Sequence, residues 1–98
     1  MSFFLILTPS AKQELKELKD SPHLEKRFKA ASKALKLLTE NPRHPSLQTH
    51  PYSSLSGPDG EKVFEAYAEQ DTPAAYRIFF YYGHTRGEIV VFAITPHP

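Results

Sequence analysis

The apolar positions in the first half of the chain recur with the period of a helix. Residues 3–7 form an apolar run before a Thr-Pro pair, and we interpret this run as a buried strand. A hydroxyl followed by Pro is typical of a helix start, and Ala11, Leu15 and Leu18 then recur at helical spacing. The pattern predicts a first helix that ends near Lys19.

A second and longer apolar stripe follows. Five apolar residues recur at spacings of four and three: Leu24, Phe28, Ala31, Leu35 and Leu38. They predict a second helix from Pro22 to about Thr39, which ends at Asn41-Pro42 because Pro cannot continue the hydrogen-bond ladder. The turn between the two helices is short, so we expect an antiparallel helical hairpin.

From residue 62 onward the period changes to two. Before that point, residues 41–60 contain four prolines and two glycines, and we expect a long loop on the substrate side of the domain. Three segments rich in β-branched and aromatic residues then predict hairpin-connected strands over residues 62–69, 75–82 and 88–95. The expected fold is one α+β domain, residues 1–98, with an N-terminal β-strand and helical hairpin packed on a mostly antiparallel sheet of about four strands.

The alternation along these strands predicts two different sheet faces. We assign the more uniformly apolar residues to the face under the helices: Phe64, Ala66, Ala68, Ile78, Phe80, Val90, Phe92 and Ile94. The other face, which we expect to be open, then gathers Glu65, Tyr67, Arg77, Tyr81 and, if the chain stays extended, His97.

The polar face contains groups suited to a phosphodiester. A guanidinium can clamp developing charge, imidazole and carboxylate groups can transfer protons, and aromatic rings can stack on bases. The same residues also fit plainer roles. Arg77 and Glu65 can form a cross-strand ion pair, Tyr67 and Tyr81 can be packing residues, and His97 can be frayed. Alternation alone does not decide between these readings.

Composition narrows the classes of site. The chain has no cysteine, which excludes disulfides and cysteine-based zinc sites and fits a reducing, cytoplasmic location. The histidines lack ligand spacing, so we expect neither a metal nor a cofactor. The apolar start is too short for a membrane span, and we expect no membrane partner. Net charge is +1, and the lysines of residues 11–43 form either a solvated surface or a basic rim for RNA.

Several segments, in this order, resemble the RelE/ParE toxin superfamily of bacterial toxin–antitoxin systems. They are the apolar first strand, the helical hairpin with its Asn-Pro exit, Leu55-Ser56-Gly57, the run from Ala75 to Phe80, and Ile94-Thr95-Pro96-His97. The resemblance covers nearly the whole chain and implies a small sheet-and-hairpin domain. It also implies a cognate antitoxin peptide or protein as partner.

The resemblance implies a chemistry as well. RelE-like members cleave ribosome-bound mRNA without a metal, through attack of the 2′-hydroxyl on the adjacent phosphate. Arg77 matches the strand arginine that contacts the scissile phosphate, and His97 matches a terminal general acid, with Glu65 or Tyr67 as base or orienting group. The near-neutral charge and the absence of basic residues in 64–67 favour an alternative. In that alternative the domain is a ParE-like gyrase-directed toxin, or a non-catalytic member that binds an antitoxin.

Overall fold

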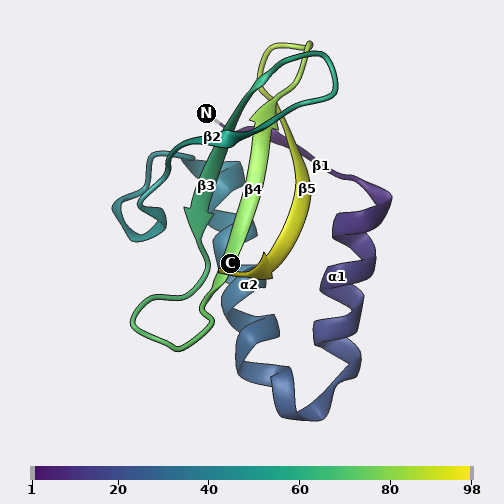
Figure 1. Ribbon diagram of the computed structural model, residues 1–98, viewed down its shortest axis with the longest axis vertical. Helices are drawn as coiled ribbons and strands as arrows, with labels where there is room; N and C mark the ends of the chain where they lie inside the picture. Colours follow the sequence, from purple (N-terminus) through teal and green to yellow (C-terminus); the bar gives the residue numbers. More distant parts are fainter. Residues whose placement is uncertain (1, 98) are drawn as a thin grey trace.

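Two helices lie against one face of a five-stranded sheet (Figure 1). The computed structural model describes residues 2–97. The elements are β1 (Phe4–Leu7), α1 (Pro9–Asp20), α2 (Glu25–Glu40), β2 (His50–Ser56), β3 (Lys62–Tyr67), β4 (Tyr76–Tyr82) and β5 (Glu88–Pro96). The predicted α+β class and helical hairpin are confirmed, and the additional strand, β2, comes from the segment expected to be a loop.

The helix boundaries follow the start and stop signals closely. Thr8 caps α1 through its side-chain oxygen, as the Thr-Pro pair predicts. The second helix begins later than expected, because residues Pro22–Leu24 form a short 3₁₀ turn, η1, and α2 starts at Glu25. The hydroxyl of Ser21 donates to the Glu17 carbonyl in the preceding helix, so it does not cap the following one.

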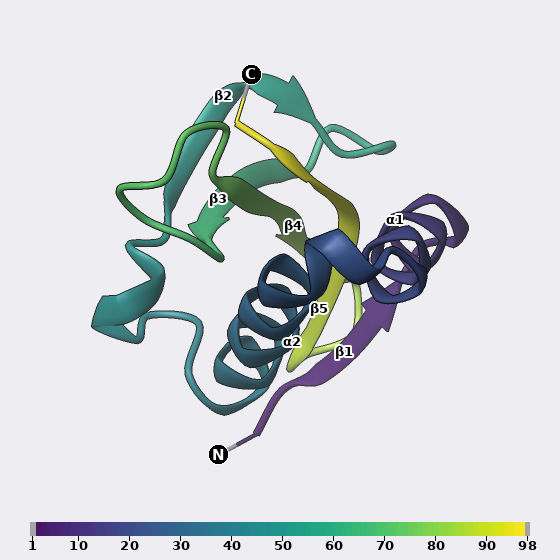
Figure 2. The same ribbon diagram turned by 90° about the horizontal axis from the view of Figure 1, so that it is seen from below.

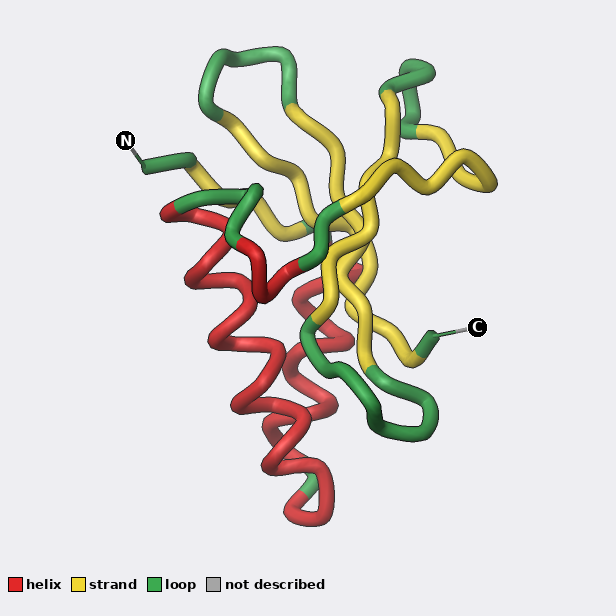
Figure 3. The backbone as a smooth tube through the Cα atoms, turned by 90° about the vertical axis from the view of Figure 1, so that its left-hand side faces the viewer, coloured by secondary structure: helices red, strands yellow, loops and turns green. Residues whose placement is uncertain are grey.

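The strands are ordered β1-β5-β4-β3-β2 across the sheet. β1 is parallel to β5, whereas the remaining neighbours are antiparallel. The N-terminal strand therefore pairs with the C-terminal strand, and the hairpin strands fill the rest of the sheet. Figure 2 shows both helices under one face and β2 at the opposite edge from β1, and Figure 3 shows the helical and strand layers side by side.

The expectation that residues 41–60 form a loop is wrong for its second half. A short 3₁₀ turn, η2 (Pro45–Leu47), leads into β2, where His50 pairs with Glu65 and Pro51 with Phe64. Pro51 is compatible with this strand because β2 lies at the sheet edge, where a missing N–H breaks no ladder. The pairing then shifts before Ser56.

The face assigned to the helices is confirmed for β3 and β4. Phe64, Ala66, Ile78 and Phe80 all belong to the core cluster under the helices or pack against it. Helix α2 contributes the largest set of buried residues from the helical layer: Ala31, Ala34, Leu35 and Leu38. Because this core occupies the sheet face under the helices, any functional site on the sheet must lie on the opposite, outer face.

The assignment of β5 is wrong for Val90 and Phe92, because a bulge changes the alternation there and Val90 pairs with Tyr81 of the outer face. Phe79 pairs with Ala93 and Phe80 with Val91, so Phe92 is an extra residue between them. Val91 consequently lies in the core, and Phe92 packs against the Phe79 ring on the other face. One inserted residue exchanges the two faces of a strand, which alternation cannot anticipate.

The outer face is not the open surface that we expected. Glu65, Arg77 and Phe79 on that face are only 3%, 8% and 4% exposed. Tyr52 of β2 packs edge-on against Phe79, with ring centroids 5.0 Å apart. The outer face is thus a second, partly polar interior covered by the β2 edge.

Candidate functional site

Three of the five predicted site residues are neighbours on β3 and β4. Tyr67 lies directly opposite Arg77 in the antiparallel ladder, and Glu65 lies two residue pairs away, opposite Phe79. The guanidinium carbon of Arg77 is 3.7 Å from the Tyr67 ring centroid. Its Nε is 3.7 Å from Oε2 of Glu65, which makes an ion pair. The shared face predicted from alternation is therefore correct for these residues.

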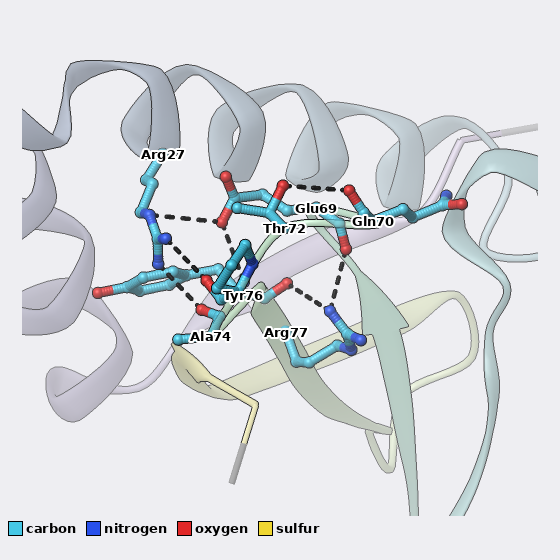
Figure 4. Close-up of polar contacts among 8 residues, drawn as sticks. Arg27, Glu69, Gln70, Thr72, Ala74, Tyr76 and Arg77 are labelled. Carbon is cyan, nitrogen blue, oxygen red and sulfur yellow. Dashed lines mark hydrogen bonds and ion pairs between the residues drawn. The ribbon is translucent and has the colours of Figure 1, made fainter.

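The guanidinium of Arg77 is held in place by main-chain oxygens. Its Nη1 donates to the carbonyl of Glu69 at 3.0 Å and, at 3.4 Å, to that of Tyr76 (Figure 4). Within residues 2–97, Arg77 Nε and Glu65 Oε2 are buried side-chain atoms that lack a hydrogen bond. Their mutual attraction at 3.7 Å offsets part of the desolvation of both charges.

His50 joins this cluster from β2, although sequence reasoning did not select it. Its Nε2 is 2.8 Å from Oε1 of Glu65, and its Nδ1 is 2.8 Å from the carbonyl oxygen of Gln48. The ring meets the Tyr67 ring edge-on at 5.8 Å. Unlike Glu65, the His50 side chain is 42% exposed. We therefore define the acidic-basic cluster as His50, Glu65, Tyr67 and Arg77.

The loop between β3 and β4 is tied to helix α2 by Arg27. The Arg27 guanidinium donates to the carbonyls of Pro73 and Ala74 and lies 5.2 Å from the Tyr76 ring (Figure 4). Its Nε is 3.8 Å from the Glu69 carboxylate, which accepts the Tyr76 N–H. These contacts fix the start of β4, and hence the position from which Arg77 projects.

Tyr81 lies away from the cluster. It is four residues beyond Arg77 on β4, which is roughly 13 Å along a strand. Its ring packs on Phe92, 5.9 Å away. Burial raises the pKa of the Tyr81 phenol, and the nearby carboxylates of Glu61, Asp59 and Glu88 raise it further. The structure does not bring Tyr81 together with Arg77.

His97 continues the strand as far as the described residues extend. Its N–H donates to the carbonyl of Ala75 at 2.8 Å, so pairing persists beyond the end of β5. Thr95, two residues earlier, is the direct ladder partner of Arg77. The chain is thus extended at His97, as the sequence reasoning required, and this residue is exposed beside the Arg77 end of the sheet.

A groove adjoins Tyr67. It has a volume of about 280 Å³ and lies between α2, η2 and the end of β3. Its polar lining residues are Lys33, Ser46, Tyr67 and Gln70. The groove gives a ligand access to the ring on which Arg77 stacks, whereas the guanidinium itself is mostly covered.

One group of described residues has the donor atoms of a cation site. The ligand atoms of Asp59, Glu61 and His84 all lie within 4.8 Å of one another. The spacing of ligand residues along the sequence does not reveal this group, because the two acids and the histidine come from different hairpin turns. His84 already contacts both acids, at 3.2 Å and 3.5 Å, and it lies with Asp59 on an exposed surface. Among residues 2–97, no helix combines the length and the hydrophobicity needed to cross a bilayer.

No protein-family profile and no curated protein matches this sequence. Two solved structures do share its fold. A YoeB/ParE toxin from Agrobacterium tumefaciens superposes with a TM-score of 0.71 at 13% identity, over 97% of this chain and 99% of that one. A chain of the archaeal RelE–RelB complex from Pyrococcus horikoshii OT3 superposes with a TM-score of 0.64 at 13% identity, over 98% of this chain and 96% of that one. The element order, the sheet and these full-length superpositions show that the chain has the fold of the RelE/ParE toxin superfamily.

Proposed function

We propose that this protein is the toxin of a toxin–antitoxin pair and that it cleaves ribosome-bound mRNA in the cytoplasm. The similarity to two toxin structures over nearly the full length of each chain supports the first part. The neighbour from Pyrococcus horikoshii is a RelE–RelB complex, which supports a protein antitoxin as the partner of this chain.

The observation that carries the nuclease proposal is the meeting of Arg77, Tyr67 and the His97 backbone at one end of the sheet. In the proposed reaction the 2′-hydroxyl of the RNA attacks the adjacent phosphate. Arg77 stabilises the negative charge that develops on phosphorus-bound oxygens, and His97 protonates the leaving 5′-oxygen. The Tyr67 ring, which borders the groove, stacks on a base.

The rigidity of Arg77 favours such a role. Two backbone carbonyls and the Tyr67 ring fix the guanidinium before any substrate binds. A donor group fixed in advance stabilises a transition state without the cost of reorienting during the reaction. The phosphate must approach from the exposed side, where His97 lies.

The direct test is cleavage of mRNA in a purified translation system, read by primer extension, with and without a metal chelator. Wild-type protein should produce new 5′ ends on ribosome-bound mRNA in both conditions. Because His97 is exposed, His97→Ala should leave the melting temperature unchanged and slow cleavage by about 10²–10⁴-fold. His23→Ala, at another exposed histidine in η1, is the matched control and should cleave normally.

A second function is favoured by a specific observation, the low exposure of Arg77. A guanidinium that is 8% exposed and bound to two carbonyls is also what a purely structural arginine looks like. In that case the domain is a non-catalytic antitoxin-binding module or a gyrase-directed toxin. Growth arrest with a DNA-damage response and intact mRNA would select the gyrase-directed toxin. Binding of an antitoxin without any growth effect would select the module.

A further inference from the structure

Both ring nitrogens of His50 face oxygen acceptors. Nδ1 lies 2.8 Å from the main-chain carbonyl oxygen of Gln48, which can only accept a hydrogen bond. Nε2 lies 2.8 Å from a carboxylate oxygen of Glu65. The two contacts together fix the orientation of the imidazole ring.

Glu65 is enclosed by neighbouring side chains. Glu65 is 3% exposed, and its other oxygen faces the guanidinium of Arg77, which is always protonated. Tyr67 packs on both His50 and Arg77, and the Glu69 carboxylate faces Arg27 instead. His50 and Arg77 thus contact the two oxygens of the Glu65 carboxyl group, and the buried Glu65 holds the His50 imidazole in place.

We propose that His50 is the general base of the RNA cleavage and that Glu65 is its positioning residue. This inference rests on the proposed ribonuclease function and assigns the general base, for which that function names no residue. Sequence reasoning offered Glu65 as the base, but its burial and its bonds to His50 and Arg77 keep it from a substrate. His50 is 42% exposed, and its Nδ1 contact lies on the exposed side whereas its Nε2 contact is partly buried.

Each proton moved in the cleavage step has a donor and an acceptor among the RNA, His50 and His97. The working base is neutral His50 with its proton on Nε2, donated to Glu65, and with Nδ1 turned from Gln48 toward the RNA. Nδ1 takes the proton of the 2′-hydroxyl while the bond from this oxygen to phosphorus forms. The bond from phosphorus to the 5′-oxygen breaks, and His97 supplies the proton to that oxygen. The products are a 2′,3′-cyclic phosphate and a 5′-hydroxyl, and His50 ends the step with a proton on each ring nitrogen.

The test compares His50→Gln with wild type and with His23→Ala across pH. The glutamine amide keeps a hydrogen-bond donor toward Glu65, so folding should be retained. It cannot accept the proton of the 2′-hydroxyl, so the general base is lost. Single-turnover cleavage should fall by about 10²–10⁴-fold, and the rise in rate between about pH 5 and 8 should disappear. Glu65→Gln should lower kcat at unchanged KM. If His50→Gln folds, cleaves at the wild-type rate and keeps the rise, the proposal is wrong.

A measurement on the folded protein separates the possible failures. Nitrogen chemical shifts of the His50 ring should change in Glu65→Gln, because Nε2 then loses its carboxylate partner. Unchanged ring shifts in Glu65→Gln would refute Glu65 as a positioning residue. If wild-type protein cleaves no mRNA, the proposed function fails together with His50 as base. If wild type cleaves and His50→Ala, stable by thermal melting, cleaves equally well, only the His50 inference fails.

Discussion

Replacing Arg77 by Ala should destabilise the fold before it reveals anything about catalysis. Arg77 and Glu65 are 8% and 3% exposed, and their charged atoms lie 3.7 Å apart. Removing the guanidinium leaves the Glu65 carboxylate buried with His50 as its remaining ionic partner. The variant also loses the stacking on Tyr67 and the hydrogen bond to the Glu69 carbonyl.

The loss of folding free energy in Arg77→Ala can be worked out from these contacts. Breaking a buried ion pair by truncating one partner costs about 3–5 kcal/mol, because the other charge stays buried. We expect about 3 kcal/mol for Arg77→Ala, at the lower end, since His50 still contacts Glu65. A domain of 98 residues has a total stability of about 5–15 kcal/mol. The variant therefore loses a substantial share of its stability, and loss of toxicity in cells would not by itself identify a catalytic arginine.

Urea unfolding followed by circular dichroism measures this cost, and a double variant separates it from chemistry. Glu65→Leu combined with Arg77→Met removes both charges and should be within about 1 kcal/mol of wild type or more stable. That folded protein lacks both the proposed phosphate clamp and the carboxylate that positions His50, so its loss of cleavage reports on the site rather than on stability. A cost below about 1 kcal/mol for Arg77→Ala would refute the reasoning, because the pair would then contribute no more than an exposed one.

Three further outcomes can be checked on the isolated protein. The raised pKa of Tyr81 means that the folded state keeps this proton longer than the unfolded state, so unfolding free energy should fall as pH rises above about 10. Between about pH 9 and 11, the melting temperature of the Tyr81→Phe variant should fall less than that of the wild type. Ala74→Gly should stabilise by about 0.5–1 kcal/mol in urea, because φ is 53° at Ala74, whereas Ala75→Gly, at a buried alanine, should destabilise. Arg27→Ala should speed hydrogen exchange of the Tyr76 amide, since Arg27 ties the preceding loop to α2.

The sequence predicted the parts of the site that depend on local periodicity. The pairing of β3 and β4 over residues 64–67 and 77–80 has no irregularity, so alternation alone placed Glu65, Tyr67 and Arg77 on one face. The helical hairpin was equally accessible, because spacings of three and four persist along both stripes.

The remaining features depend on interactions between distant segments. Val90, Val91 and Phe92 are all apolar, so the bulge leaves no mark in the alternation of β5. His50 reaches Glu65 only because β2 pairs at the sheet edge, and Pro51 argued against a strand there. The burial of Arg77 likewise comes from packing across the sheet, which no local pattern encodes.

The parallel pairing of β1 with β5 has a consequence for synthesis of the protein. Phe4 is the ladder partner of Glu88, so the sheet cannot be completed until β5 has left the ribosome. At about 5–20 residues per second, translation leaves the first strand without its partner for several seconds. The acidic-basic cluster also needs β4, which supplies Arg77, and Arg77 in turn pairs with Thr95 of β5. Under the proposed function, a nascent chain would therefore stay inactive toward the ribosome that makes it, and an antitoxin would have until the sheet closes to be present.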